Sequence, residues 1–356
     1  MLVREIIDSK AIAIQRTEAA SNKIPYLGEG LFPAKKKSGL DLKWIKGHKG
    51  VPVSLMPSTF DAKATLRSRE GFQIMKTEMP FFREGYLIKE QDRQDLRRVA
   101  EMSDPLYSEI VTRIYDDINN LLDAADVVPE RMVWQLLAPT NGVPKISIQA
   151  NGVTYAYNYD PNGEWATNHY LDVTGTATNK WSDAANSDPL EDARTLQEKI
   201  EIEYGVRPTV MVVSSLTMGY LRKNQKVRDA ILTQTEAQKI YMSDNLVKQV
   251  FLDNLGITIV PYAKKFKTEA GVATSFYPDG YASLIPAGSL GNMWYGVTPE
   301  EDIAAEEKSF DVAVINGKAA IAVTHTLDPV QTKTIASEIV LPSFERMDEC
   351  GVIKCY

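Results

Sequence analysis

The chain has 356 residues, of which 44% are hydrophobic and 24% are charged, with a net charge of −7 at pH 7 and an isoelectric point near 5.3. These values are typical of a soluble folded protein that is long enough for two domains, and no apolar run approaches the roughly 18 residues that cross a membrane. The net negative charge argues against a dedicated nucleic-acid-binding protein. The two cysteines, Cys350 and Cys355, are too few for a disulfide framework, and we predict ordinary thiols.

The N-terminal segment, residues 1–30, is predicted to be a flexible arm. Charges of both signs interrupt its apolar residues, so it does not resemble a signal peptide, and we expect a protein that is made and used in a cytosol. Only short helical patterns are present, and a loop with several prolines and glycines follows them.

The next segment has an unusual charge. Residues 31–100 contain fifteen Lys or Arg and eight Asp or Glu, a net charge of +7, whereas residues 1–30 are neutral and residues 101–356 carry −14. One molecule therefore joins a basic segment to an acidic body. An acidic neighbouring copy is the simplest surface on which such a segment could lie.

This basic segment is also prone to form strands. The runs LDLKWIK and VPVSLMP flank a turn with two glycines, which predicts a hairpin over residues 39–56. A second extended pair is predicted over residues 62–69 and 72–78. An isolated hairpin is marginal in water, so these strands need a partner. The apolar arm residues that we expect to become buried are Trp44, Phe81, Phe82 and Tyr86.

A helical pattern begins at Ser103-Asp104-Pro105, where a capping side chain precedes a proline in the first turn. Apolar residues then recur at three- and four-residue steps as far as Ala125, which predicts an amphipathic helix of about 20 residues and roughly 30 Å. Pro129 is predicted to open a further helix that ends at Pro139. Two strands follow over residues 146–150 and 153–159.

Alternating helices and strands predict a small α/β domain over residues 186–308. Its helices begin at Asp188 and Asp244 and end at Gly205 and Gly256, with further helical segments around residues 218–221 and 227–232. Its strands are the runs PTVMVVS, ITIVP, YASLIP and MWYGV. The tail has two further runs, FDVAVINGKAAIAVTHTL and TIASEIVLPSF, which we expect to rejoin the sheet that precedes Asp188.

The sequence offers no catalytic, metal-binding or cofactor-binding residues. His48, His169 and His325 lie in separate segments without ligand spacing, and we interpret His48 as solvated and His325 as a partly buried structural residue. Ser214 follows a buried strand but lacks the glycines of a nucleophile elbow, so Ser214 or Ser215 is expected to cap the next helix.

The charged clusters also suggest no chemistry. Asp116-Asp117 is expected on a solvent face of the long helix, and Glu300-Glu301-Asp302 is expected at a turn or helix start. The cluster Lys35-Lys36-Lys37 has no interleaved aromatic residues, unlike a single-strand stacking platform. It could contact either a neighbouring subunit or DNA, and the acidic body favours the neighbour.

Several segments carry a resemblance to a known family. The chain resembles the major capsid proteins of tailed bacteriophages with the Hong Kong 97 fold, and more narrowly the lambda-type group, major capsid protein E. The most specific segments cover about 70 N-terminal residues and a short piece near residues 290–301, and they read GLDLKWIKG, VSLMPSTFDAKA, EMPFFREGYLIKEQDRQ and GNMWYGVTPEE. The remainder agrees in the order of its predicted elements.

The resemblance implies an α+β fold with a fixed order of parts. These are an N-terminal arm (1–30), an extended hairpin loop (31–87), a peripheral domain with a spine helix (88–185), an inserted α/β axial domain (186–308) and a return to the peripheral domain (309–356). It also implies that the extended loop overlaps the adjacent subunit. Some relatives crosslink a loop lysine to an asparagine, but nothing in the sequence identifies Lys63 as such a residue.

The implied function is structural and not enzymatic. Hexamers and pentamers of the chain would self-assemble in the bacterial cytoplasm into the icosahedral head of a phage or prophage virion, which encloses double-stranded DNA. Implied partners are a portal protein, a decoration protein, DNA held non-specifically and a separate scaffolding protein, because there is no room for a cleavable scaffolding region before the extended loop. No cofactor and no membrane is expected.

Two alternatives belong to other classes. An encapsulin-like compartment would share the fold but enclose cargo enzymes in place of DNA. A cytosolic hydrolase would use the α/β region at residues 186–308, but it would require a nucleophile with an aligned base, and the sequence offers none.

Overall fold

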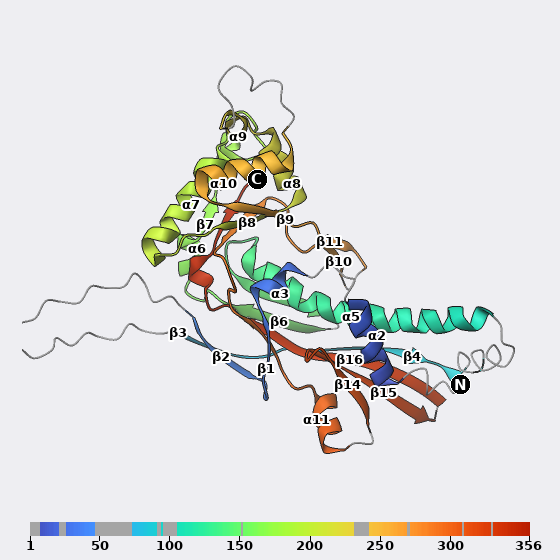
Figure 1. The fold of residues 1–356 in the computed structure, drawn as a ribbon. Coiled ribbons are helices and arrows are strands. Elements are labelled where there is room, and N and C mark those ends of the chain that lie inside the picture. Colours follow the sequence, from blue (N-terminus) through green and yellow to red (C-terminus); the bar gives the residue numbers. More distant parts are fainter. Residues whose placement is uncertain are drawn as a thin grey trace, which may run out of the picture. The chain divides into compact units, whose positions relative to one another are not determined.

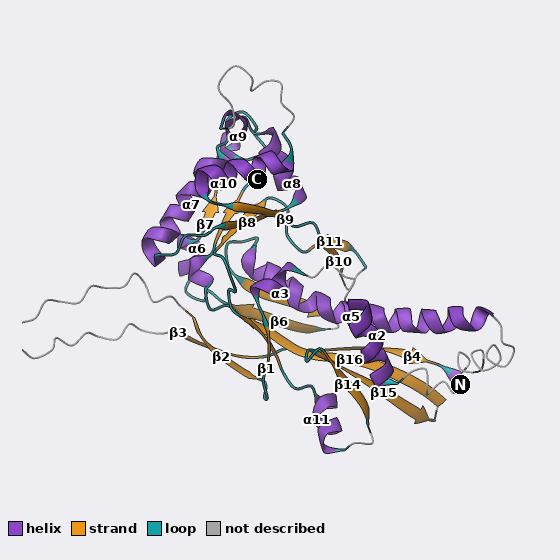
Figure 2. Ribbon diagram, viewed as in Figure 1, coloured by secondary structure: helices purple, strands orange, loops and turns teal. Residues whose placement is uncertain are grey.

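The computed structural model divides into two compact units, each of which mixes helices and strands (Figures 1 and 2). Unit 1 comprises residues 1–43, 76–132 and 291–343, and unit 2 comprises the remainder. The predicted α+β class is therefore confirmed. The structure describes residues 8–20, 26–46, 73–90, 94, 105–150, 152–230, 242–268, 271–307, 310–328 and 330–356.

Unit 1 is built on a six-stranded sheet. The strand order is β1–β13–β16–β15–β14, and β4 also pairs with β16. Every pair is antiparallel except β1 with β13, which is parallel. The strands are β1 (Ala34–Lys36), β4 (Phe81–Ile88), β13 (Asn292–Tyr295), β14 (Asp311–Ile315), β15 (Ala319–Leu327) and β16 (Val330–Ser343).

The long strand β16 organises this sheet because it pairs along both edges. One edge pairs with β15, and the other pairs first with β4, from Ile88↔Thr332 to Phe81↔Ile339, and then with β13. The two backbones approach closely at Gly85, where a Cβ atom would lie 2.7 Å from the carbonyl oxygen of Thr334. Glycine is therefore the residue that fits in the middle of β4.

The turn between β14 and β15 is the predicted Asn316-Gly317 turn. Both residues have positive φ, 49° and 70°, as the central residues of a type I′ turn require, and Lys318 completes the connection between the paired residues Ile315 and Ala319. The N–H of Lys318 donates to the carbonyl oxygen of Ile315 at 2.9 Å and closes the turn. The local sequence was sufficient for this prediction.

The partners of these strands differ from the prediction. We expected the C-terminal strands to rejoin the sheet that precedes Asp188. β14–β16 form a sheet with β4, which does precede Asp188, and with β13. The strands that we expected in that sheet, β5 (Lys145–Ala150) and β6 (Val153–Asn158), instead form a two-stranded sheet of their own. β17 (Gly351–Lys354) lies beyond the two predicted C-terminal runs and pairs with β7 (Tyr170–Asp172), which also precedes Asp188. Strand pairing depends on contacts between distant segments, which a local pattern does not contain.

The N-terminal segment is more ordered than predicted. It forms α2 (Ser9–Ala20) and α3 (Leu27–Leu31), and α2 lies over the sheet of unit 1 (Figure 1). Ile12 of α2 is 1% exposed. It packs in an apolar core together with side chains of α5 and side chains of the sheet. That core consists of Ile12, Ile118, Leu121, Leu122, Ile315, Ile321, Val323 and Ala336.

The long helix α5 (Pro105–Leu137) is one element, although two helices were predicted. Pro129 lies inside it, where a proline lacks one N–H and costs roughly 3 kcal/mol relative to alanine. Buried side chains on both sides of the proline, such as Leu122 and Met132, hold the helix together. Tertiary packing thus overrides the local signal.

The predicted hairpin over residues 39–56 is only partly described. β2 (Asp41–Lys46) is present, but in the described part of the chain it pairs with β3 (Gln73–Glu78). The strand predicted at residues 51–57 and the strand predicted at residues 62–69 lie outside the described residues. β2 and β3 therefore bracket the undescribed segment 47–72.

Unit 2 contains a five-stranded sheet in the order β7–β17–β12–β8–β9, with helices packed against it (Figure 2). β12 is antiparallel to both of its neighbours, whereas the outer pairs β7–β17 and β8–β9 are parallel. The other bounds are β8 (Val210–Val213), β9 (Thr258–Pro261), β10 (Lys265–Lys267), β11 (Ala273–Ser275), β12 (Tyr281–Ile285), α6 (Glu164–Asn168), η1 (Ala177–Asn179), α7 (Pro189–Tyr204), α8 (Ser215–Lys223), α9 (Gln225–Asp229), α10 (Asp244–Leu255) and η2 (Met347–Glu349).

The helix boundaries of unit 2 agree with the prediction. The side chain of Asp188 accepts from the N–H of Glu191 at 3.1 Å and caps α7, which ends at Gly205 with a φ of 71°. α10 begins at Asp244, as predicted, after the capping residue Ser243, and ends at Gly256 with a φ of 69°. These signals are local, so they could be predicted without knowledge of the fold.

Candidate assembly surface

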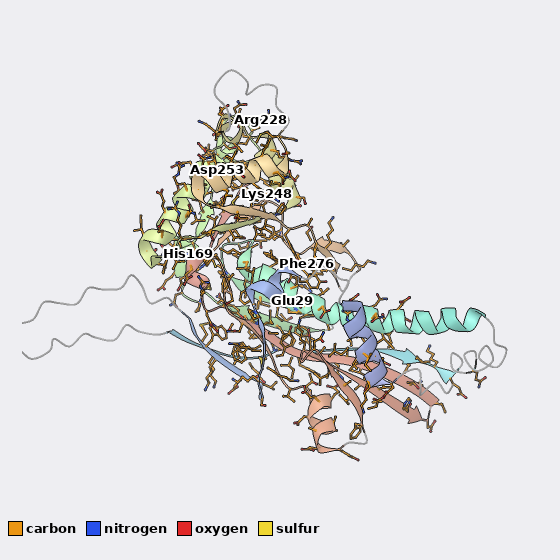
Figure 3. The ribbon with its side chains drawn as sticks, viewed as in Figure 1. Glu29, His169, Arg228, Lys248, Asp253 and Phe276 are labelled. Atoms are coloured by element: carbon orange, nitrogen blue, oxygen red, sulfur yellow. The ribbon has the colours of Figure 1, made fainter. Side chains whose placement is uncertain are left out.

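The histidines occupy structural positions or the surface. His169 is 2% exposed, its Nε2 lies 3.1 Å from the hydroxyl of Tyr204, and its ring stacks on Trp165 with a centroid distance of 5.5 Å (Figure 3). His325 is exposed on β15 and hydrogen-bonds Thr332 at 3.0 Å, so the expectation of a partly buried residue was wrong. His48 lies outside the described residues.

Ser214 caps a helix, as predicted. Its hydroxyl accepts from the N–H of Thr217 at 3.2 Å at the start of α8, and the side chain is only 3% exposed. Its other hydrogen-bond partner is the Thr217 hydroxyl at 3.1 Å. Both contacts belong to the helix cap and neither supplies a catalytic base.

The thiols and acidic residues form no metal centre in the described part of the chain. No group of three or more His, Cys, Asp or Glu among these residues could hold a metal ion. Cys350 and Cys355 are buried, which raises the pKa of both thiols well above the ordinary value. Among the same residues, no helix combines the length and apolar character that crossing a bilayer requires.

The acidic cluster at residues 300–302 lies at a helix start, as predicted. Thr298 caps α11 (Pro299–Glu306) by accepting from the N–H of Glu301, and the carboxylates occupy the first turn, where the helix dipole favours them. Glu300 binds Arg83 of β4 at 2.8 Å and accepts from the hydroxyl of Ser337 at 2.8 Å. The first turn of α11 thus fastens β4 to the sheet.

The three consecutive lysines also have partners within the chain. Lys36 forms an ion pair with Glu301, Lys37 donates to the carbonyl oxygen of Asp41, and the Lys35 ammonium lies 5.6 Å from the ring centroid of Trp294. The pairing of β1 with β13 brings Lys35 beside Trp294, whereas the contact of Lys37 with Asp41 is local in the sequence. Part of the basic segment thus neutralises an acid of its own subunit, while all of β1 stays exposed, so the expected contact of the cluster with a neighbour or DNA stays a prediction.

Buried polar contacts hold the N-terminal helices on α5. Arg16 of α2 is 4% exposed, and its guanidinium lies 2.6 Å from carboxylate oxygens of Asp123 and of Asp126. Glu130 accepts from the N–H of Gly28 at 3.0 Å and supplies a carboxylate at the start of α3. Burial, reinforced by these three carboxylates, raises the pKa of Tyr26 to about 12.

One buried carboxyl was not found from the sequence. Glu338 of β16 is 3% exposed, and its Oε1 has no hydrogen-bond partner in the described part of the chain. In the sequence Glu338 stands between Ser337 and Ile339, a pattern that does not distinguish a buried polar residue from an exposed one. Its burial depends on strands that pair with β16 along both edges. Burial raises its pKa well above the ordinary value.

The apolar arm residues divide into two groups. Trp44 is 7% exposed and its ring lies 5.4 Å from that of Tyr159. Phe81 and Phe82 are half-buried, whereas Tyr86 and Leu87 are 44% and 42% exposed on β4. The described subunit therefore leaves apolar surface uncovered along β4, as an assembling protein would.

Comparison with known families identifies the chain. The model of a family described as phage major capsid protein E matches residues 13–349. The chain belongs to this family. As a member of this family it is a structural protein of the phage capsid and not an enzyme, it associates with copies of itself in the capsid shell, and it is a component of the virion.

Solved structures support the fold. A phage-related protein from Bordetella bronchiseptica has 13% sequence identity and a TM-score of 0.56, over 98% of this chain and 97% of that one. A protein described as a prophage capsid protein of E. coli CFT073 has 13% identity and a TM-score of 0.57, over 98% and 99%. At this identity the likeness establishes the capsid-protein fold alone. No curated protein sequence is significantly similar to the chain.

Proposed function

We propose that this capsid protein assembles as hexamers and pentamers into an icosahedral shell that encloses double-stranded phage DNA. The observation that carries the proposal is the match to the major capsid protein family along residues 13–349. The exposed apolar side chains of β4 supply surface that a single subunit leaves in water. Repeated at every interface, burial of such surface supplies the free energy of assembly.

The division into capsid subdomains is part of this proposal. Residues 1–30 form the N-terminal arm, 31–87 the extended loop, 88–185 and 309–356 the peripheral domain, and 186–308 the axial domain. Its ends, β1 and β4, pair within their own subunit, and the part between them lies over the adjacent subunit. A neighbour that packs on β4 buries Phe81, Phe82 and Tyr86. The half-exposed and exposed states of these rings in the subunit support this role.

The proposed assembly takes place in the cytoplasm of the bacterial host with a portal protein and a separate scaffolding protein, and a decoration protein binds the shell. DNA is held without sequence specificity. Residues 101–356 carry a net charge of −14, which repels the phosphate backbone of DNA. This repulsion keeps any contact between the protein and the DNA weak, in agreement with DNA that is held without specificity.

Imaging of the expressed protein tests the proposal. The chain is produced with and without a candidate scaffolding protein and examined by negative-stain microscopy and sedimentation. Closed shells in either sample are expected, and persistent monomers in both samples would contradict the proposal. Shells from lysed host cells are then treated with nuclease: protected double-stranded DNA is expected, whereas protein cargo in its place would support the encapsulin-like alternative.

A further inference from the structure

Unit 2 carries two strongly exposed apolar side chains on elements that lie apart. Ile202 of α7 is 79% exposed, the highest value for a large hydrophobic side chain in the described part of the chain, and Val272 beside β11 is 60% exposed. Figure 1 shows α7 on one flank of unit 2 and the β10–β11 hairpin on the opposite flank. Neither side chain contributes to the core of unit 2.

The hairpin is a supported projection with a basic face. The ring of Phe266 in β10 lies 4.8 Å from that of Phe276 in a tilted arrangement, and the ring of Phe276, which Figure 3 labels, lies 6.5 Å from that of Tyr262. These rings anchor one face of the hairpin in unit 2. Lys265 and Lys267 flank Phe266 in β10 and therefore point to the other face, where both are exposed.

These two lysines have no ion-pair partner among the residues that the structure describes. Beyond β10, the N–H of Thr268 donates to the carbonyl oxygen of Val272 at 2.9 Å. The N–H of Val272 in turn donates to the hydroxyl of Thr268 at 3.2 Å, so the backbone of Val272 is held on both sides while its side chain is exposed. An exposed apolar side chain beside exposed cations fits a surface that is apolar and acidic.

α7 offers such a surface. Its inner face is formed by Ala193, Leu196 and Ile200, which are buried in the core of unit 2. Its outer face places Glu198 one turn before Ile202, so that the two side chains are neighbours. Glu203 is adjacent and exposed, and the helix as a whole has five acidic and two basic residues.

We propose that, within a ring of subunits, the β10–β11 hairpin of each subunit docks on α7 of its neighbour. Val272 then lies against Ile202, and the two hairpin lysines face Glu198 and Glu203. A ring requires two different, complementary patches on opposite flanks of each subunit, and these two elements meet that requirement in position, charge and hydrophobicity. The inference rests on the proposed function, because the ring is the proposed hexamer or pentamer.

Disulfide crosslinking tests the contact directly. Val272→Cys and Ile202→Cys are introduced into one chain, and assembled shells are oxidised mildly and run on a denaturing gel without reductant. The natural thiols are 2% and 0% exposed, so they give little background. A ladder of covalent dimers up to the full ring is expected, and each single substitution serves as the control without a ladder. Shells without crosslinked dimers overturn the inference but leave the proposed function standing, whereas the absence of wild-type shells overturns both.

A charge exchange gives a second, independent test. Lys265→Glu with Lys267→Glu, or Glu198→Lys with Glu203→Lys, places like charges across the contact and is expected to reduce the yield of shells at least about tenfold. All four substitutions in one chain restore opposite charges and are expected to return the yield to within about twofold of the wild type.

The matched control for the charge exchange is Lys223→Glu with Lys226→Glu, which makes the same charge change on exposed residues of α8 and α9. This control is expected to assemble normally. A low yield from the fourfold variant despite an unchanged melting temperature of its subunit would overturn the contact. So would a normal yield of shells from the hairpin variant with less nuclease-protected DNA, because that result assigns the lysines to DNA.

Discussion

At the scale of single residues, Glu338 makes the stability of the subunit depend on pH. Burial, followed by the negative charge of Asp126, raises its pKa well above 4.5, whereas Lys318 acts in the opposite direction. The folded subunit therefore retains a proton that the unfolded chain releases. The corresponding stability is fully present below about pH 4.5, the ordinary pKa, and is lost as the pH rises through the folded pKa.

Replacing the carboxyl by an amide should remove this dependence. We expect Glu338→Gln to raise the free energy of unfolding at pH 8 by about 1–3 kcal/mol, with a difference that shrinks towards pH 5. Urea denaturation of the unassembled subunit, followed by circular dichroism at both pH values, measures the effect. Glu84→Gln on the exposed face of β4 is the control. Equal effects of Glu338→Gln at pH 5 and pH 8 would show that Glu338 does not titrate in this range.

At the scale of secondary-structure elements, Arg16 fastens α2 to α5. Burial acts to lower the pKa of Arg16, but Asp123 and Asp126 outweigh it, and the pKa is raised. We expect Arg16→Ala to destabilise the subunit by about 2–3 kcal/mol, since it leaves two neighbouring carboxylates without their cation. Hydrogen exchange should become faster over residues 9–20. Lys10→Ala, at an exposed position of the same helix, should leave both quantities unchanged.

The same scale shows which elements the sequence could predict. Helix starts at Asp188 and Ser214 and the Asn316-Gly317 turn were predicted correctly, because each depends on hydrogen bonds or φ values within a few residues. The break predicted at Pro129 was wrong because side chains distant in sequence bury α5 on both sides of it. The predicted partner of β2, at residues 51–57, lies outside the described residues. β2 instead has β3 as a described partner, which the strand patterns alone did not indicate.

The candidate assembly surface was less predictable than the helices. The basic segment and the acidic first turn of α11 were both recognised, yet their contact was not, because Lys36 and Glu301 are 265 residues apart. Whether two opposite charges meet within a subunit or between subunits depends on the register of β1 with β13, which periodicity does not determine. The exposed pair Ile202 and Val272 likewise becomes informative only when burial is known.

At the scale of the whole molecule, the uneven charge affects how subunits meet. Residues 31–100 carry +7 and residues 101–356 carry −14, but Lys36 and Arg83 are already paired within the subunit. The remaining basic surplus can act between subunits. Exposed ion pairs contribute only about 0–1 kcal/mol each, so this charge accelerates encounters more than it stabilises the shell.

Assembly should therefore be more sensitive to salt than the finished shell. Raising the ionic strength from about 0.05 M to about 0.5 M shortens the screening length well below the size of a subunit, and we expect the assembly rate to fall about tenfold. Light scattering after mixing subunits with scaffold measures that rate. Finished shells moved to the same salt should sediment unchanged, because apolar burial and strand pairing hold them together. An assembly rate that is equal at both ionic strengths would rule out electrostatic steering, and dissolution of finished shells would show that ion pairs hold the interfaces.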